Sequence, residues 1–130
     1  MIDMRQSLET IMTGDEWPKL LGVEVLENQI NLALEVDANL HWLKGHFPAQ
    51  PVLPGVVQTH WAAQLAQHFF ATATAPRRID NLKFQNVVLP PQQCTLQLIA
   101  NADTTSIHFR YTDPATPGHI FSEGKLIFRE

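Results

Sequence analysis

The stretch GVVQTHWAAQLAQHFFATAT, residues 55–74, contains no proline and no glycine after Gly55. It predicts a helix of about 18 residues that begins at Gly55. Apolar side chains fall on both faces of that helix, a pattern typical of a helix buried on nearly all sides. The rest of the fold must therefore supply enough surface to enclose it.

The segments around this helix predict strands. In INLALEV, residues 30–36, apolar and polar side chains alternate, which indicates a half-buried strand. GVEVLE, residues 22–27, is its predicted hairpin partner, with a turn at Asn28 and Gln29. A short helix and a turn are predicted within residues 2–21. Four further strands are predicted after the helix, with turn residues between them, over residues 79–89, 93–101, 106–113 and 119–130.

One buried helix and about six antiparallel strands define an α+β domain in which the sheet wraps around the helix. No linker, repeat or low-complexity tract interrupts the sequence, so residues 1–130 are predicted to form a single domain. The edges of such a sheet need cover, and side-by-side pairing of two subunits would supply it. The sequence therefore predicts a dimer.

The composition narrows the classes of partner. Apolar residues make up 45% of the chain and charged residues 17%, as in ordinary globular proteins. A formal net charge of −4 argues against nucleic acid or an anionic membrane as the main partner. The opening residues MIDMRQSLETIM lack the apolar region of a signal peptide, and no stretch approaches the roughly 20 apolar residues of a membrane span. A cytoplasmic protein is predicted.

Sequence signatures of metal and nucleophile chemistry are missing. His60 and His68 would lie about 12 Å apart along the helix axis, too far to share one ion. The motifs HExxH, CxxC and GxSxG and glycine-rich phosphate loops are absent. Cys94, the only cysteine, lies in a predicted strand and is expected to be a buried structural thiol. No metal and no cofactor is predicted.

The segment HFPAQPVLPGV, residues 46–56, is the candidate site. Its prolines at 48, 51 and 54 restrict the backbone, so the loop is expected to be stiff. His46 is a possible general base, and Gly55 opens a helix whose free N–H groups can receive a partial negative charge. These two groups are what the removal of a proton next to a carbonyl requires.

The segment GHFPAQPVLPGVVQTHWAAQ, residues 45–64, resembles the signature HFPGxPVxPGVLxxEAxAQ of the FabZ/FabA-like 3-hydroxyacyl-acyl-carrier-protein dehydratases. IDNLKFQNVVLPPQQCTLQL and FSEGKLIF are similar to later stretches of that family, so the resemblance runs from about residue 20 to the end. It implies the hotdog fold, usually dimeric. It also implies elimination of water from a 3-hydroxyacyl thioester, without a cofactor, to give the trans-2-enoyl product. An acyl carrier protein would present the substrate on phosphopantetheine.

The resemblance also implies roles for individual residues. His46 matches the histidine that takes the α-proton, and the Gly55 N–H matches the group that polarises the thioester carbonyl. Val56 and Gln64 fall on neighbouring substrate-binding positions. The family has Glu or Asp fourteen residues after the histidine, and here that position is His60. An imidazolium can also protonate the departing hydroxyl, so a pair of histidines is expected to act as base and acid.

With histidine in the acid position, the chain resembles the aryl-polyene-type dehydratases, a subgroup of the same fold. Ala49 replaces the family glycine after HFP, which removes no chemical group. Two alternatives stay open. A hotdog thioesterase would need a carboxylate or a polarised water beside the thioester, and the lack of an acidic residue between Asp37 and Asp80 counts against it. A non-catalytic subunit would complete the site of another hotdog protein, so the partner of this chain is either a second copy or a different hotdog subunit.

Other residues receive structural interpretations. The rings of Trp61, Phe69 and Phe70 are expected in the core, and Trp42 either lines the acyl tunnel or packs. His68 is expected on the helix surface or at an interface. No role is assigned to three histidines without a converging partner, namely His41, His108 and His119. Three basic residues are candidates for docking the acidic carrier protein, namely Arg77, Arg78 and Lys83.

Overall fold

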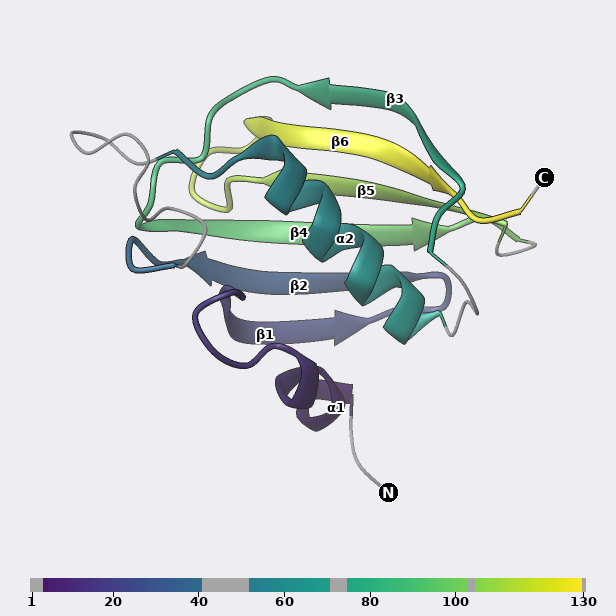
Figure 1. Ribbon diagram of the computed structural model, residues 1–130, viewed down its shortest axis with the longest axis horizontal. Coiled ribbons are helices and arrows are strands. Elements are labelled where there is room, and N and C mark those ends of the chain that lie inside the picture. The colour runs from purple at the N-terminus through teal and green to yellow at the C-terminus, as the bar shows by residue number, and fades with distance from the viewer. Residues whose placement is uncertain (1–3, 41–51, 71–74, 103–104, 130) are drawn as a thin grey trace.

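The computed structural model describes residues 4–40, 52–70, 75–102 and 105–129. Within these ranges, six strands form one antiparallel sheet in the order β1-β2-β4-β5-β6-β3. Helix α2 (Gly55–Phe69) lies across one face of this sheet, as Figure 1 shows. The strands are β1 (Lys19–Val25), β2 (Gln29–Val36), β3 (Arg78–Phe84), β4 (Gln92–Ala100), β5 (Ser106–Thr112) and β6 (Ile120–Ile127). The expected α+β hotdog architecture is confirmed.

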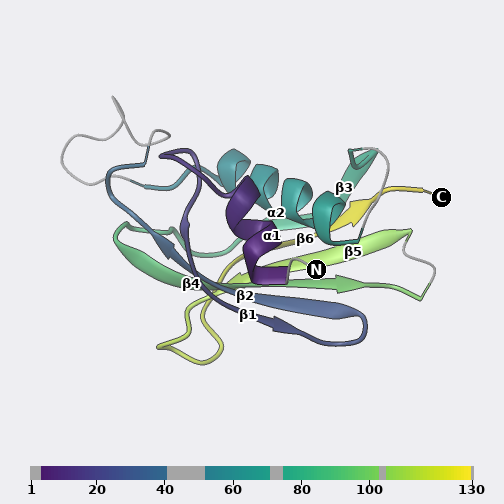
Figure 2. The ribbon, with the colours of Figure 1, turned by 90° about the horizontal axis from the view of Figure 1, so that it is seen from below.

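Helix α1 (Met4–Ile11) lies on the same side of the sheet as α2 (Figure 2). Leu8 anchors α1 in the core and is fully buried. The Ser7 hydroxyl lies 2.8 Å from Nε2 of His68, which joins α1 to the last turn of α2. His68 is therefore a surface residue of α2 that contacts a second helix. Neither of the two helices in the described ranges is long and apolar enough to cross a membrane.

Strand β2 carries the alternation that the sequence predicts. The side chains of Ile30, Leu32, Leu34 and Val36 are buried, because they face α2 and the core. The hairpin differs in its bounds from the prediction. The strand β1 begins at Lys19, which pairs with Glu35, and Gln29 belongs to β2 rather than to the turn.

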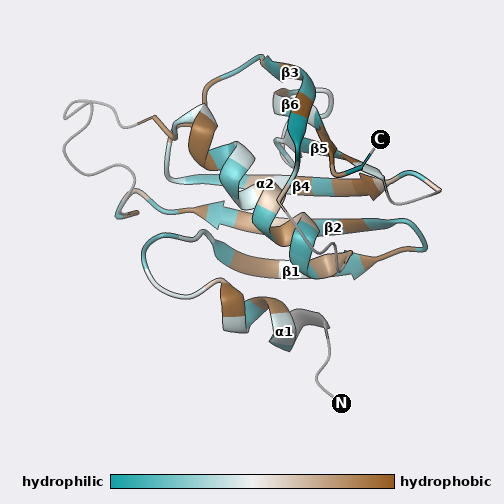
Figure 3. Cartoon of the chain, turned by 45° about the vertical axis from the view of Figure 1, so that its right-hand side comes forward, coloured by the Kyte–Doolittle hydropathy of each residue, from teal (hydrophilic) through white to brown (hydrophobic). Residues whose placement is uncertain are grey.

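Helix α2 is shorter and less buried than predicted. Its buried face consists of Val57, Gln58, Trp61, Ala62, Leu65 and Ala66. The opposite side presents an exposed stripe, defined here as Val56, His60, Gln64 and His68, which follow one another at intervals of four residues. Figure 3 shows the mixed hydropathy of the helix surface. Burial on nearly all sides was the wrong expectation, because one sheet covers one side of a helix within a single subunit.

Strand β3 forms one edge of the sheet and is also shorter than predicted. Its side chains are exposed almost throughout, including Ile79, Leu82 and Phe84. The pairing of β3 with β6 shifts between Asp80 and Lys83. Beyond Phe84 the chain leaves the sheet and continues toward β4. The apolar side chains that the sequence placed in a strand therefore lie on an exposed edge.

Glu123 on β6 is the centre of a charged cluster on the sheet. Its Oε1 lies 3.3 Å from both Nη2 of Arg110 and Nε2 of His108, and Gln85 donates to its Oε2 at 3.0 Å. His108 thus has a partner that the sequence did not reveal. Partial burial raises the pKa of the Glu123 carboxyl. The charge and hydrogen bond of Arg110, followed by those of His108, outweigh this effect and leave the pKa below its ordinary value.

Replacing Glu123 by Gln should lower the free energy of unfolding at pH 7 by about 1 kcal/mol. Because the pKa of Glu123 is lowered by folding, its stabilisation is present above the pKa of the unfolded chain and is lost as pH falls through the folded pKa. The stabilities of parent and Glu123→Gln should therefore approach each other as the pH falls below the ordinary pKa of a Glu carboxyl, about 4.3. Urea unfolding at several pH values measures this. A difference that is constant with pH would contradict the charge-based explanation.

Candidate active site

The N-terminus of α2 offers backbone hydrogen-bond donors. Pro54 precedes the helix with extended backbone, and its carbonyl accepts the N–H groups of Val57 and Gln58 at 3.1 and 3.3 Å. Among the described residues, the N–H groups of Gly55 and Val56 have no hydrogen-bond partner. They stand at the positive end of the helix dipole, where a carbonyl oxygen that gains negative charge is stabilised.

At Gly55 a side chain approaches the backbone closely. A Cβ atom built on Gly55 would lie 2.5 Å from Cε1 of Phe84 and 2.6 Å from its Cζ. The Phe84 ring thus lies directly against the backbone at the start of α2. A larger residue at position 55 would force this half-exposed ring to move. The glycine is therefore explained by the space available beside the N-terminus of the helix.

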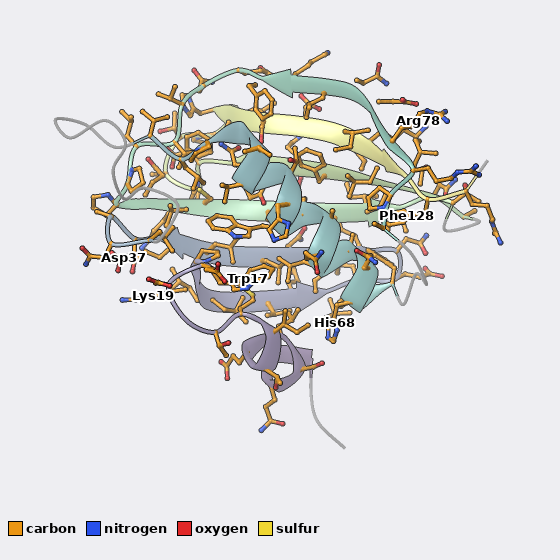
Figure 4. The ribbon with its side chains drawn as sticks, in the orientation of Figure 1. Trp17, Lys19, Asp37, His68, Arg78 and Phe128 are labelled. Atoms are coloured by element: carbon orange, nitrogen blue, oxygen red, sulfur yellow. The ribbon has the colours of Figure 1, made fainter. Side chains whose placement is uncertain are left out.

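His60 lies on the exposed stripe, one turn after Val56. Its ring centroid is 6.2 Å from that of Trp17, with the planes tilted by 36°. Trp17 also stacks on Trp61, at 6.4 Å and 20°. The indole Nε1 of Trp61 donates to the Glu16 carbonyl at 2.9 Å, so the segment before β1 is fastened to α2. Figure 4 shows Trp17 beside this helix.

Trp17 was missed by the sequence analysis, which interpreted its surroundings as a turn. The contact between Trp17 and His60 joins residues that are 43 positions apart. No local pattern in the sequence signals such a contact. Its consequence is that the candidate acid lies beside an aromatic ring from another segment of the chain.

A small hollow adjoins Trp17. It has a volume of about 130 Å³ and is lined by Gly14, Asp15, Trp17, Lys19, Asp37, Asn39 and Leu40. Lys19 forms ion pairs with Glu35 and Asp37, at 3.9 and 4.0 Å, close to the end of β2 (Figure 4). The hollow adjoins Leu40, the last described residue before the segment that carries His46.

Most of the predicted site residues lie on one helix. The structure brings together Gly55, Val56, His60 and Gln64 on α2, with the last three on its exposed stripe. His46 lies outside the described residues, as do His41, Trp42 and Ala49. Its position relative to α2 therefore stays a prediction. In the part of the chain that the structure describes, no group of three or more metal-ligating side chains converges.

The three aromatic residues of the helix segment lie where the sequence analysis expected them. Trp61 is fully buried, and Phe69 and Phe70 pack against the core at its margin. The candidate docking residue Arg78 is paired with Asp80 at 3.0 Å, whereas Lys83 lines a second hollow. This second hollow has a volume of about 430 Å³ and is lined by Asn81, Lys83, His108, Glu123, Gly124 and Lys125. The ring of His119 contacts that of Phe121.

Comparisons with known proteins identify a family for this fold. A family model described as ApeI dehydratase, ApeI-like, matches residues 23–125. A 3-hydroxyacyl-[acyl-carrier-protein] dehydratase FabZ from Rickettsia felis is 32% identical, over 97% of this chain and 94% of the relative.

Two solved structures share the fold. The dehydratase heterocomplex ApeI:P from Xenorhabdus doucetiae is similar with a TM-score of 0.75 and 30% identity, over 85% of this chain and 96% of the matched chain. An uncharacterized protein from Erwinia carotovora subsp. atroseptica is similar with a TM-score of 0.73 and 34% identity, over 85% of this chain and 94% of the matched chain. The suspected FabZ-like resemblance is confirmed.

Cys94 should be chemically inert in the folded protein. Burial, and to a smaller extent the charge of Asp113, raises the pKa of the Cys94 thiol to about 12. At pH 8 only about 10⁻⁴ of it would be thiolate, the form that reacts with iodoacetamide. Mass spectrometry should find no alkylation of the native protein and one modified thiol after denaturation. Rapid alkylation of the native protein would contradict the burial of Cys94.

Proposed function

Because the chain belongs to the ApeI-like dehydratase family, we propose that it removes water from a 3-hydroxyacyl thioester carried by an acyl carrier protein. The product is the trans-2-enoyl thioester. The relatives named FabZ support this reaction, and the histidine at the acid position favours a place in fatty-acid or aryl-polyene-type biosynthesis. The reaction needs no oxidant and no reductant, since C2 loses a proton and C3 loses hydroxide, which together form water.

The observation that carries this proposal is the arrangement at the start of α2. The N–H of Gly55, which has no hydrogen-bond partner within the described part of the chain, and the side chain of His60 belong to the same short stretch of helix. His60 is about 7.5 Å further along the axis. A thioester carbonyl bound at Gly55 would extend its C3 hydroxyl toward the exposed stripe. An oxyanion donor and a proton donor are thus available at the two ends of the reacting group.

In the proposed reaction His46 takes the proton from C2. The electrons move into the carbonyl, and the developing negative charge is stabilised by the Gly55 N–H. The C3–O bond then breaks as His60 gives its proton to the hydroxyl, which leaves as water. His46 ends with one proton more and His60 with one fewer, and exchange through solvent resets the pair.

We propose that each active site is shared between two subunits. Exposed apolar side chains on an edge strand favour association, and β3 presents Ile79, Leu82 and Phe84. Pairing of two β3 edges about a two-fold axis would continue the sheet and bring two α2 helices together. The exposed stripe, with Val56 at 72% exposure, would then be covered by the partner, whose loop supplies His46.

The partner is either a second copy or a different hotdog subunit. The solved heterocomplex ApeI:P favours the second possibility, since a chain of that complex is 30% identical to this one. The carrier protein would dock on the basic residues beside β3. Arg77 and Lys83 are candidates there, with Arg78 engaged by Asp80. A thioesterase finds no support in the family match.

Replacing His46 by Ala should lower turnover of a 3-hydroxyacyl thioester by about 10²-fold or more, because an essential base is lost. His60→Ala should be similarly inactive, whereas His60→Glu restores the family residue and should retain measurable activity. Formation of the enoyl thioester on a carrier protein is the assay, with circular dichroism to check folding. Full activity of His46→Ala or His60→Ala would refute the corresponding role.

The shared site predicts that two inactive variants restore activity together. Homodimers of His46→Ala and of His60→Ala each contain two damaged sites. Mixed dimers contain one doubly damaged site and one intact site, so activity should recover to about half that of the parent. Two affinity tags isolate the mixed dimer for the assay. An isolated mixed dimer without activity would contradict a site shared between copies of this chain.

A further inference from the structure

Trp17 is held in place by two contacts. Its indole ring stacks on that of Trp61, with 6.4 Å between the ring centroids and 20° between the planes. Trp61 is fully buried, and its Nε1 donates to the carbonyl of Glu16, the residue before Trp17, at 2.9 Å. A ring that is fastened through its stacking partner and through its backbone neighbour cannot swing aside without loss of close packing. Trp17 therefore forms a fixed wall beside α2.

The fixed ring of Trp17 separates the candidate acid from a hollow. On the helix side, its centroid is 6.2 Å from that of His60. On the other side, it lines the hollow of about 130 Å³ together with Lys19 and Leu40, whereas His60 is not among the described residues that line this hollow. Figure 4 shows Trp17 beside α2, with Lys19 and Asp37 at the same end of the sheet. Removal of the indole would join the hollow to the space beside His60.

The proposed reaction brings one part of the substrate to this ring. The C3 hydroxyl is placed at His60, and C4 is bonded to the same carbon, so the groups on C4 lie next to the imidazole. An unbranched chain leaves C4 in one direction, which the exposed stripe offers from His60 toward Gln64. A chain that is branched at C4 needs a second direction. The partner subunit would cover the outer side of the stripe, and Trp17 occupies the side that faces the hollow.

We infer that Trp17 is a specificity-determining residue, which admits 3-hydroxyacyl thioesters with an unbranched C4 and excludes those that carry a methyl branch there. This inference rests on the proposed function. To accept the branch, either the indole would have to leave Trp61 or C4 would have to move away from Trp17. The second movement would carry the C3 hydroxyl away from His60, and a small misplacement of a reacting group slows the reaction strongly.

The test compares Trp17→Ala with the conservative variant Trp17→Phe. The substrates are the pantetheine thioesters of 3-hydroxypentanoate and 3-hydroxy-4-methylpentanoate, and the measured quantity is the ratio of kcat/KM for the unbranched over the branched substrate. The parent should prefer the unbranched substrate by about tenfold or more, as is usual when a pocket discriminates by one methyl group. Trp17→Ala should bring the ratio close to one. Trp17→Phe keeps a ring at this position and should retain part of the preference.

A merely structural role of Trp17 would leave this ratio unchanged. Both substrates are measured on the same sample, so a loss of folded protein lowers both rates equally. Ile30→Ala is the matched control, because it also weakens the core. Ile30 pairs with Val25 at the end of β1 that lies away from Trp17 (Figure 1), so this variant should keep the ratio of the parent. A parent without preference, or the same ratio in Trp17→Ala as in the parent, would overturn the inference.

Binding of the product thioesters separates this inference from the proposed function. Calorimetry measures the Kd of the pantetheine thioesters of trans-2-pentenoate and 4-methyl-trans-2-pentenoate without any turnover. The parent should bind the unbranched product more tightly by about tenfold, and Trp17→Ala should bind both alike. This result with a parent that dehydrates neither substrate would contradict the proposed function and support the role of Trp17. Dehydration without selectivity would do the reverse, and a parent that binds neither product would overturn the inference.

Discussion

Helix α2 packs against a single sheet, and the other features of the molecule depend on this one-sided contact. Large side chains such as Trp61 and Leu65 are fully buried between helix and sheet. Each contributes about 1.5–3 kcal/mol of hydrophobic stabilisation. Because these side chains fit only one rotation of the helix about its axis, the opposite side is fixed as well. The positions of Val56, His60 and Gln64 on the exposed stripe are thus a consequence of core packing.

The packing of α2 on the sheet also restricts the backbone at the residues where the chain enters the helix. The backbone at Gly55 passes so close to the Phe84 ring that the ring would have to move to admit a Cβ, and the preceding turn is tied to Val88 and to Gln58. A helix N-terminus ordinarily frays, since its first N–H groups have no partner within the helix. Here the neighbouring contacts fasten the backbone, while the N–H groups of Gly55 and Val56 find no partner in residues 4–40, 52–70, 75–102 and 105–129. The contacts that fasten this segment are made by the Leu53 carbonyl, which accepts from Gln58, and by the Leu53 N–H, which donates to Val88. They therefore do not use the first N–H groups of the helix.

How far the sequence predicts this molecule depends on whether the relevant contacts are local. The strand β2 and the number of strands follow from alternation of side chains, which is a local property. The contacts of Trp17 with His60 and of His108 with Glu123 depend on which segments the fold brings together, so no pattern announces them. Gln58 is an intermediate case. A polar residue at a buried position of a helical repeat is visible in the sequence, although its partners are not.

The buried side of α2 stabilises the fold, whereas its exposed stripe carries His60, the acid of the proposed reaction. His60, which stands where the resemblance places a carboxylate, is exposed, and its ring lies beside the partly buried Trp17. The helix dipole favours a negative side chain only within the first turn, and His60 is the sixth residue of α2. Exchange of a carboxylate for an imidazole therefore costs little folding free energy. A comparable change at the buried position 58 would remove the hydrogen bonds that the side chain of Gln58 forms with Ser122 and with the Leu53 carbonyl, and is therefore expected to destabilise the fold. In the proposed reaction, the group that acts as the acid can therefore differ in chemical type while the packing of the helix stays the same.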